Sequence, residues 1–235
     1  MKVFNLSVVL PTYQERENLA ILIPQIEDVF SNELLEIIVV DDNSQDGTIE
    51  LIAKLNLKYS NIKLITRPSL QGIGSAIRRG YDEALGDFIL SSDADLSFTV
   101  GDMRVLYKKI NEGFDLVTGY RHGGGSYERE KISVKVKYLI SKFGNKFVHY
   151  VSGLGTRDFS ANFRIIRKDA WNKIETCENT NALLFEMIIK SFRKGLKITE
   201  VPISFTERRF GSSKLNLWKE TPKFLIKFIK YSLER

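Results

Sequence analysis

Short runs rich in Val, Ile and Leu alternate with longer helical patterns through the first half of this 235-residue chain. The expected strands are Phe4–Leu10, Glu36–Val40, Ile62–Thr66, Asp87–Ser91 and Asp115–Thr118, and the expected helices lie near residues 15–30, 46–58, 73–85 and 101–112. Such alternation is typical of βαβ units, which build a parallel sheet covered by helices on both faces. We therefore predict an α/β fold whose ligands bind beyond the carboxyl ends of the strands.

The composition is that of a globular protein, with 43% of the residues hydrophobic and 27% charged. We expect residues 1–235 to form a single domain. The one cysteine, Cys177, excludes an internal disulfide framework and favours a reducing, cytoplasmic location. No uncharged apolar run reaches the roughly 18 residues that a spanning helix needs, so we expect the protein not to cross a membrane.

The charges are divided unequally along the chain. Residues 1–128 carry a net charge of −7 and residues 129–235 carry +13, within a total of +6. This asymmetry suggests a bound cation on one side and a phosphate-rich or membrane partner on the other. The Gly-rich stretch His122–Ser126 lies near the boundary, and we expect it to be a flexible hinge or lid.

The turns after the first and third expected strands argue against a dinucleotide-binding fold. Pro11–Asn18, after the first strand, contains no glycine. Gly72-Ile73-Gly74 follows the third strand and lacks the third glycine, because residue 77 is Ile. The glycines that would bring a backbone close to a pyrophosphate are therefore missing.

Carboxylates follow the second and fourth expected strands. Asp41 and Asp42 come after the second strand, where a carboxylate can accept hydrogen bonds from a ribose diol or a base edge. Helix capping and turn chemistry is the other interpretation there, and it accounts for Ser44 and Asp46. In the stretch Ser91–Ser97, after the fourth strand, two carboxylates stand two residues apart. This pattern suits Mg²⁺ or Mn²⁺ carrying a diphosphate.

In this order and spacing, PTYQEREN, VVDDNSQDGT, QGIGSAIRRGY and SDADLS resemble the nucleotide-sugar half of family-2 glycosyltransferases with the GT-A fold. Downstream, Gly119-Tyr120-Arg121, the stretch Asp158–Arg164 and the segment EVPISF resemble the dolichol-phosphate mannosyltransferases, in their short form without transmembrane helices. The closing Arg-x-x-Gly-x-Ser-Lys, Arg208–Lys214, is the most specific piece. The resemblance implies a GT-A fold with a mostly parallel open sheet.

The resemblance also implies roles for individual residues. The nucleoside would be held by Pro11, Tyr13, Glu15, Val40 and Asp42, the metal and diphosphate by Asp93, Ala94, Asp95 and Ser97, and phosphate or sugar by Arg121, Arg208 and Lys214. The metal ligands among them would be Asp93, Asp95 and Ser97, and the catalytic residues would be Asp93, Asp95, Arg208 and Lys214. Three positions depart from the family's pattern: Phe98-Thr99-Val100 lacks the usual proline, Ala161-Asn162 stands where small Ser or Gly is common, and Gln71 replaces a basic residue.

The implied reaction is an inverting, Mg²⁺- or Mn²⁺-dependent transfer of a hexose, mannose from GDP-mannose, to a polyprenyl or dolichyl phosphate at a membrane surface. Residues 1–128 would then be the nucleotide-sugar half, and residues 129–235 the basic acceptor and membrane-facing half. One alternative is transfer to a hydroxyl of a growing glycan, with Asp158 as the general base that such an acceptor needs. The other is a non-catalytic module that binds nucleotide sugars or phospholipids.

Two segments of the basic half have helical periodicity with a lysine stripe beside an apolar face. They are residues 131–151 and the segment from Thr221, where Thr221 and Pro222 form a helix-start signal. Surface helices with solvated lysines are one interpretation, and interfacial membrane helices are the other. Nucleic acid is not favoured as a partner, because no stacking platform accompanies the charge. We expect peripheral binding to the cytoplasmic face of a membrane, which leaves room for a membrane-anchoring partner subunit.

Overall fold

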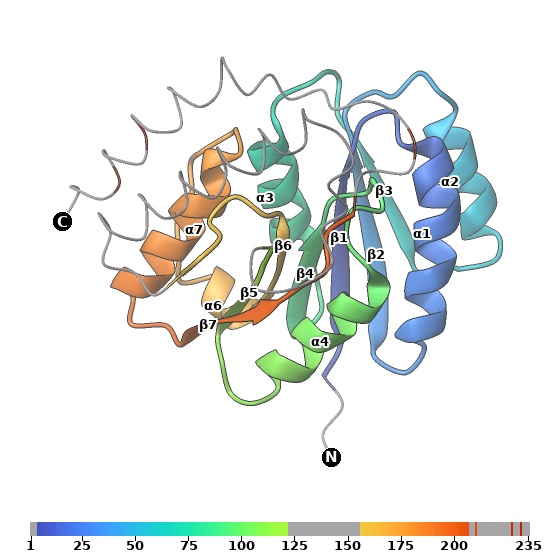
Figure 1. Ribbon diagram of the computed structural model, residues 1–235. Coiled ribbons are helices and arrows are strands. Elements are labelled where there is room, and N and C mark those ends of the chain that lie inside the picture. Colours follow the sequence, from blue (N-terminus) through green and yellow to red (C-terminus); the bar gives the residue numbers. More distant parts are fainter. Residues whose placement is uncertain (1–3, 122–155, 207–209, 211–226, 228–230, 232–235) are drawn as a thin grey trace.

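The computed structural model describes residues 4–121 and 156–206, together with Phe210, Lys227 and Tyr231. The described strands form a single sheet in the order β3-β2-β1-β4-β6-β5-β7 (Figure 1). The strands are β1 (Leu6–Thr12), β2 (Leu34–Asp41), β3 (Ile62–Thr66), β4 (Phe88–Ser92), β5 (Leu116–Tyr120), β6 (Phe163–Arg167) and β7 (Ile198–Pro202). The helices are α1 (Arg16–Val29), α2 (Thr48–Asn56), α3 (Ile73–Glu83), α4 (Val100–Ile110), α6 (Lys168–Trp171) and α7 (Ala182–Arg193).

The sheet is mostly parallel, as the sequence predicts. Strand β1 pairs in parallel with β2 and β4, β2 with β3, and β5 with β7. Strand β6 runs antiparallel to both of its neighbours, β4 and β5. Every strand and helix expected between residues 4 and 118 is present with its ends within two residues, whereas β6, β7, α6 and α7 were not predicted.

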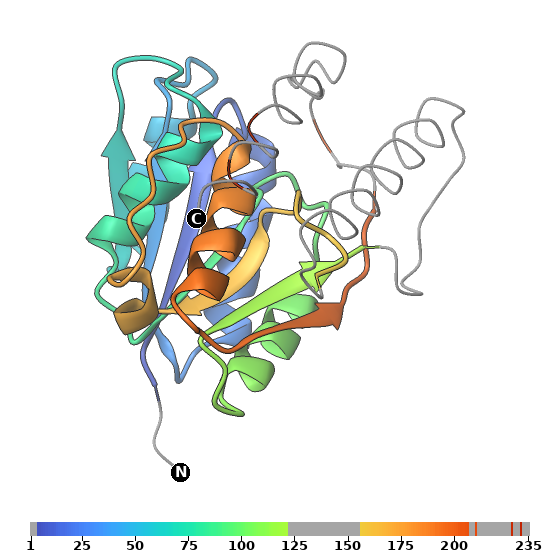
Figure 2. The ribbon, with the colours of Figure 1, turned by 90° about the vertical axis from the view of Figure 1, so that its left-hand side faces the viewer.

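Helices cover both faces of the sheet, so the layers also follow the prediction. Alternate side chains of the central strands enter different cores: Val8 packs on the face of α1 and α4, and Val9 on the face of α3 and α7. Figure 2 views the molecule from the side on which α3 and α7 lie, with the sheet behind them. Burial on both faces explains why these strands are continuously apolar.

The strand β3 is less buried than the central strands. All of β1 and β4 is buried, but Lys63, Leu64 and Ile65 of β3 are half-buried and Thr66 is exposed. The reason is its place at one edge of the sheet, where β2 is its only neighbouring strand among the described residues. An edge strand lacks the second neighbour that would cover it.

Thr99 caps helix α4 and is one of the three residues that stand where the family commonly has a proline. The Thr99 hydroxyl accepts a hydrogen bond from the Asp102 amide at 3.0 Å, which caps the helix without a proline. The Asp102 carboxylate in turn accepts a hydrogen bond from the Ser204 amide at 3.2 Å. With the bond from the Thr206 amide to the Ser97 carbonyl, at 3.1 Å, this contact holds the segment after β7 beside the end of β4.

Some predictions fall on residues that the structure does not describe. These are the hinge at 122–126, the amphipathic segment 131–151, and the assignments of Arg208 and Lys214. Of the segment after Thr221, only Lys227 and Tyr231 are described. Within residues 4–121 and 156–206, no helix combines the length and the apolar character needed to cross a bilayer.

Candidate active site

A cavity of about 490 Å³ opens at the edge of the sheet where the parallel strands β1, β2, β4 and β5 end. Because β6 is antiparallel, the start of that strand reaches the same edge. Residues predicted for the nucleotide sugar and the metal gather here: Pro11, Tyr13, Glu15, Asp42, Asp93, Ala94, Asp95, Ser97 and Arg121 all line the cavity. The structure thus brings these predicted residues together at one end of the sheet.

Among the described residues that the resemblance assigns to the nucleotide sugar or the metal, Val40 is the one that does not line the cavity. Its side chain is fully buried in the core on the α3 face of the sheet. A Cβ added at Gly80 of α3 would lie 3.3 Å from Val40 Cγ2, so this helix packs directly on the valine. The Val40 side chain thus forms part of the core and is not available to a nucleoside.

The adjacent carboxylates after β2 have different roles. Asp41 is fully buried and accepts hydrogen bonds from the amide of Ser44 at 2.8 Å and from its hydroxyl at 2.6 Å, so it holds the turn. Asp42 lines the cavity and forms an ion pair with the buried guanidinium of Arg67. Burial raises the pKa of Asp42 above its ordinary value, although Arg67 opposes this shift.

Backbone strain is concentrated in the loops around the cavity. Among the described residues, the non-glycine residues with positive φ are Gln14 (56°), Asn43 (60°) and Leu96 (61°). Each follows the end of a parallel strand, in the turns after β1, β2 and β4 respectively. L-residues rarely adopt this conformation, and such positions cluster at ligand sites, where the surrounding structure enforces them.

Asp93 and Asp95 stand directly after β4 and both line the cavity. The Asp95 carboxylate accepts a hydrogen bond from the Ser97 amide at 3.0 Å, which fixes its direction across the strained Leu96. Asp93 accepts a hydrogen bond from the side-chain amide of Asn162 at 3.1 Å. Two oriented carboxylates are therefore presented at one wall of the cavity.

These carboxylates fit a divalent cation that a substrate completes. Among the described residues, no group of three or more His, Cys, Asp or Glu side chains could hold a metal by itself. Mg²⁺ and Mn²⁺ sites at diphosphates commonly use one or two protein carboxylates, with phosphate oxygens and waters as the remaining ligands. The hard oxygen donors of Asp93 and Asp95 match that chemistry.

Arg121, which also lines the cavity, is fixed by Asp158. Its Nε donates to Asp158 Oδ2 at 2.7 Å and its Nη2 donates to Oδ1 at 3.1 Å. Asp158 is fully buried, and it also accepts a hydrogen bond from the Ser160 amide at 3.0 Å. A buried carboxylate engaged in this way cannot reach an acceptor, which corrects the expectation that Asp158 could serve as a general base.

Glu200 of β7 holds the backbone of Asp158 in place. Its Oε1 accepts hydrogen bonds from the amides of Arg157, at 2.7 Å, and Asp158, at 3.4 Å. Burial raises the pKa of Glu200 above its ordinary value. The carboxylate thus orders the backbone from which the Asp158 side chain reaches Arg121.

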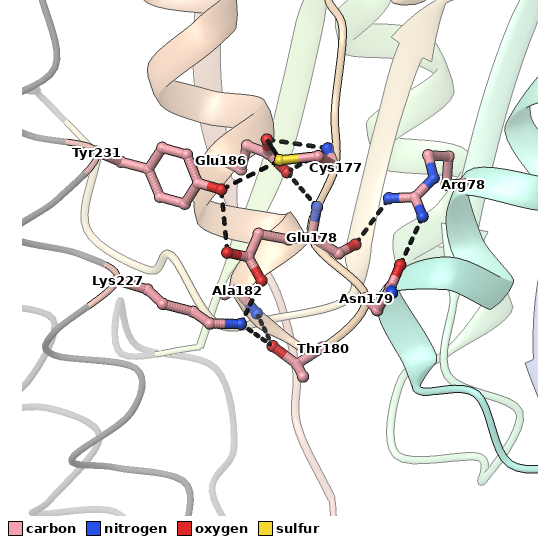
Figure 3. A network of polar contacts seen from close by, with 9 residues as sticks. All are labelled: Arg78, Cys177, Glu178, Asn179, Thr180, Ala182, Glu186, Lys227 and Tyr231. Atoms are coloured by element: carbon pink, nitrogen blue, oxygen red, sulfur yellow. Dashed lines mark hydrogen bonds and ion pairs between the residues drawn. The ribbon is translucent and has the colours of Figure 1, made fainter.

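The loop before α7 braces the side of the cavity formed by α3 (Figure 3). Arg78 of α3 donates to the Glu178 carbonyl at 2.8 Å and to Asn179 Oδ1 at 2.6 Å. On its other side, the Glu178 carboxylate binds the ammonium of Lys227 and accepts a hydrogen bond from the Tyr231 hydroxyl at 3.0 Å. One loop therefore joins helix α3, which borders the cavity, to residues near the carboxyl end of the chain.

Glu186 of α7 anchors this loop from the core. The carboxylate is fully buried and accepts hydrogen bonds from the amides of Cys177, at 3.0 Å, and Glu178, at 2.9 Å, while Lys190 lies 2.8 Å away. Burial alone would raise the pKa of Glu186, but the hydrogen bonds from Lys190 and the loop outweigh it and lower the pKa. The loop is thus held by a charged group inside the molecule.

Close packing explains the glycines whose spacing fails the dinucleotide fingerprint. A Cβ at Gly72 would lie 2.2 Å from the Asn179 carbonyl oxygen, and a Cβ at Gly74 would lie 2.3 Å from that of Thr180. Gly72 also has a φ of +92°, which favours glycine. The absence of side chains at Gly72 and Gly74 lets α3 pack directly against the loop. The Gly-x-Gly spacing was visible in the sequence, but the packing that requires it was not.

Sequence reasoning assigned no site role to several other residues of the cavity. They are Thr12, Leu70, Gly72, Ile73, Ala76, Ser160, Asn162, Asn181 and Phe205. Thr12, Gly72, Ile73 and Ala76 lie within the strand-end motifs themselves, and Leu70 directly precedes one of them. The other four lie far along the chain, near the start of β6, before α7 and after β7. Ser160 and Asn162 belong to the stretch Asp158–Arg164 that the resemblance had quoted, which was the available signal.

A solved structure shares this architecture. Glucosyl-3-phosphoglycerate synthase from Mycobacterium tuberculosis, crystallised with Mn²⁺, UDP and phosphoglyceric acid, matches with a TM-score of 0.72 over 99% of this chain and 80% of that chain. The sequence identity is 16%, so the likeness concerns the fold alone. The sheet and the helices that cover it therefore have the GT-A fold.

The family follows from the sequence comparison. Residues 7–175, more than half of the chain, match the model of glycosyl transferase family 2, and the chain belongs to that family. The dolichol-phosphate mannosyltransferase of Pyrococcus furiosus is 37% identical over 213 residues, covering 89% of this chain and 58% of that protein. The polyprenol monophosphomannose synthase of Mycolicibacterium smegmatis is 30% identical over 216 residues, covering 89% of this chain and 80% of that protein. The chain thus spans little more than half the length of the Pyrococcus protein.

Proposed function

We propose that this protein transfers mannose from GDP-mannose to a polyprenyl phosphate, with inversion at the anomeric carbon and with Mg²⁺ or Mn²⁺ on the donor diphosphate. The observation that carries the proposal is the meeting of Asp93 and Asp95 with Arg121 at one strand-end cavity. The names of the Pyrococcus and Mycolicibacterium relatives support mannose and a polyprenyl phosphate as the substrate class.

The cavity has one end suited to a nucleoside. Pro11 and Leu70 offer apolar surface there, and the carboxylate of Asp42 can accept hydrogen bonds from a ribose or a base. Arg67 holds that carboxylate through an ion pair, and Arg67 is itself tied to the carbonyl of Gly72 at 3.3 Å. The Asp42 carboxylate is therefore already held in position before the nucleotide sugar binds, which lowers the entropic cost of binding.

The other end is suited to a diphosphate. Asp93 and Asp95 would hold the divalent cation, and the Ser97 amide keeps the Asp95 carboxylate in position. When bound, such a cation offsets the negative charge that develops on the departing diphosphate. A Mycobacterium tuberculosis protein of the same fold was crystallised with Mn²⁺ and UDP, and also with Mg²⁺ and UDP, which supports a divalent metal here.

The acceptor chemistry favours a phosphate over a hydroxyl. A phosphate monoester has its second pKa near 6, so above neutral pH it is already a nucleophilic dianion and needs no general base. The one carboxylate proposed as a base for a hydroxyl acceptor, Asp158, is buried against Arg121. An arginine on the cavity wall suits an anionic substrate, because guanidinium N–H groups form charge-assisted hydrogen bonds with phosphate oxygens.

A non-catalytic binding module is the weaker alternative. The site holds two oriented carboxylates beside a strained turn, and Leu96 between Asp95 and Ser97 has a φ of 61°. Strain of this kind is retained where the surrounding structure serves a ligand. A binding module would share this strain, so the preference for an enzyme rests on the relatives, which are named as a mannosyltransferase and a synthase.

The remaining parts of the proposal concern the whole chain. We propose one domain, in which the nucleotide-sugar half of residues 1–128 binds the donor and residues 129–235 bind the acceptor. The net charge of +13 on the second part supports peripheral binding to an anionic membrane, and we place the protein on the cytoplasmic face. Arg208 and Lys214 would contact phosphate there, and a membrane-anchoring subunit is compatible with this arrangement.

Donor selectivity tests the proposed function. The purified protein is incubated with Mn²⁺, a short polyprenyl phosphate and, separately, GDP-mannose, UDP-glucose or UDP-galactose. We expect release of GDP from GDP-mannose at least tenfold faster than release of UDP from either UDP-sugar. Equal or faster turnover of a UDP-sugar would contradict the proposal that GDP-mannose is the donor.

A further inference from the structure

A chain of buried hydrogen bonds runs from helix α3 to the carboxylate of Asp93. The Tyr81 hydroxyl lies 2.8 Å from Ser91 Oγ, Ser91 Oγ donates to Asn162 Oδ1 at 2.8 Å, and Asn162 Nδ2 donates to Asp93 Oδ1 at 3.1 Å. Tyr81 and Ser91 are fully buried, and Asn162 is 2% exposed where it reaches the cavity. Tyr81, Ser91 and Asn162 thus form a series of hydrogen bonds that ends at one predicted metal ligand.

The register of the sheet produces this contact. Strands β4 and β6 are antiparallel, and their final pair at this edge is Ser92 with Phe163. The residue that follows β4 and the residue that precedes β6 are therefore opposite each other, and they are Asp93 and Asn162. No sequence spacing indicates this proximity, because 69 positions separate the two residues.

The direction of the hydrogen bonds is set at both ends. A carboxylate only accepts, so the amide of Asn162 must turn its NH₂ group toward Asp93 and its oxygen toward Ser91. Ser91 then donates its single hydroxyl proton to the Asn162 side-chain oxygen, so Tyr81 must be the donor in its hydrogen bond with Ser91. Burial raises the pKa of Tyr81 to about 12, which keeps this hydroxyl protonated.

We propose that Asn162 is a positioning residue for the metal ligand Asp93, holding its carboxylate beside Asp95 for the divalent cation. The inference rests on the proposed function, since it concerns the same cavity. A residue without a side-chain amide could not make this contact. The hydrogen bond from Asn162 restricts the Asp93 carboxylate to one orientation.

The test measures metal binding directly. Mn²⁺ is titrated into protein saturated with GDP, and free Mn²⁺ is measured by electron paramagnetic resonance. Asn162→Ala should weaken Mn²⁺ binding by about tenfold or more, as the loss of a hydrogen-bond partner behind a metal ligand does elsewhere. GDP affinity measured in EDTA should stay within twofold of wild type, because the amide acts on the metal ligand and not on the nucleotide.

Two further variants separate positioning from general damage. Asn111→Ala is the matched control, because it removes an amide that donates to the Tyr107 carbonyl at 2.7 Å on α4, and it should leave Mn²⁺ affinity unchanged. Ser91→Ala removes the donor that orients Asn162 and should also weaken Mn²⁺ binding. The double variant should bind Mn²⁺ no more weakly than Asn162→Ala alone, because both changes break the same series of hydrogen bonds.

The outcomes are distinguishable. If wild type binds Mn²⁺ and a folded Asn162→Ala variant binds it equally well, the positioning role is overturned while the proposed function stands. If wild type binds no Mn²⁺ in the presence of either GDP or UDP, both proposals fail. Should Asn162→Ala not fold, Ser91→Ala decides the question by the same measurement.

Discussion

Arg121 is held at the cavity wall by Asp158 through two parallel hydrogen bonds, of 2.7 Å from Nε to Oδ2 and 3.1 Å from Nη2 to Oδ1. The carboxylate is fully buried, whereas the arginine side chain is 17% exposed and borders the cavity. The interaction therefore fixes a positive charge at the site and removes the carboxylate from any role as a base. Two predictions follow from this division of roles between the partners.

Removing the arginine leaves the carboxylate buried without its counter-ion. Arg121→Ala should lower the free energy of unfolding by about 3 kcal/mol, the lower end of the cost of breaking a buried pair from one side. Urea denaturation measures this loss. Arg79→Ala is the control, because Arg79 pairs with Glu83 on the surface, where its side chain is 55% exposed, and it should leave the unfolding midpoint unchanged.

Asp158→Asn should alter turnover only through Arg121. The rate should keep the pH dependence of wild type between about pH 7 and 9, since a phosphate acceptor is already ionised there. Initial rates across that range, at saturating GDP-mannose, provide the measurement. A 10²–10⁴-fold loss typical of a missing general base, with Arg121→Ala still active, would favour a hydroxyl acceptor instead.

The metal prediction concerns Asp95. Asp95→Ala should reduce transfer by more than 100-fold and leave the unfolding midpoint within a few degrees, because the carboxylate follows the strand and faces the cavity. Excess EDTA should inactivate wild type to the same extent. Asp169→Ala removes a carboxylate that is 69% exposed and pairs with Lys173 on the surface, and it should retain full activity. A fully active Asp95→Ala variant would refute the assignment.

A structural feature could be predicted from the sequence when the residues that form it lie close together along the chain. The strands and helices up to Tyr120 repeat a βαβ pattern, and each motif directly follows its strand, so both were predictable. Strand β6 was not, because Arg164 in its middle suggests exposure. In the structure Arg164 is fully buried and donates to the carbonyl oxygens of Leu184 and Ala161, both at 2.7 Å. The Leu184 carbonyl lies 20 residues further along the chain, and a partner at that distance leaves no local signal.

The glycines of α3 and α4 provide a matched comparison of packing. Gly74 and Gly101 each occupy the second position of a helix. A Cβ at Gly74 would meet the Thr180 carbonyl oxygen at 2.3 Å, whereas at Gly101 its nearest neighbour would be Thr99 Oγ1 at 3.6 Å. Gly74→Ala should therefore cost about 1–3 kcal/mol of stability and weaken GDP binding, since α3 borders the cavity.

Gly101→Ala should be neutral, or should stabilise the protein by up to about 1 kcal/mol through the lower entropy of the unfolded chain. Thermal unfolding of both variants, with calorimetric titration of GDP, provides the comparison. Equal unfolding temperatures and equal GDP affinities for the two variants would show that the loop does not restrict α3 as described.

The lysines near the carboxyl end should not contribute equally to membrane binding. Lys227 forms an ion pair with Glu178 and also lies 3.4 Å from the Thr180 hydroxyl. Its charge is partly offset within the protein, whereas each surface lysine near an anionic leaflet contributes about 1 kcal/mol. Lys223→Gln/Lys230→Gln should therefore weaken sedimentation with phosphatidylserine vesicles by roughly 30-fold at low salt, and Lys227→Gln by less than threefold.

Salt provides the control for this prediction. Raising the ionic strength to 0.5 M should remove most vesicle binding of wild type, because screening shortens the range of the attraction. Binding that does not change with salt, or an equal loss for all three lysines, would contradict an electrostatic attachment through this segment.

The identity of the atom that receives mannose tests the central claim most directly. Wild-type protein, Mn²⁺ and GDP-mannose are incubated with an equimolar mixture of a short polyprenyl phosphate and the corresponding free polyprenol, and lipid products are identified by mass spectrometry. The account predicts a mannosyl phosphoryl polyprenol as the dominant glycolipid, absent from reactions with EDTA or with Asp95→Ala. Mannose attached to the free polyprenol, or GDP release without any phosphate-linked glycolipid, would contradict it.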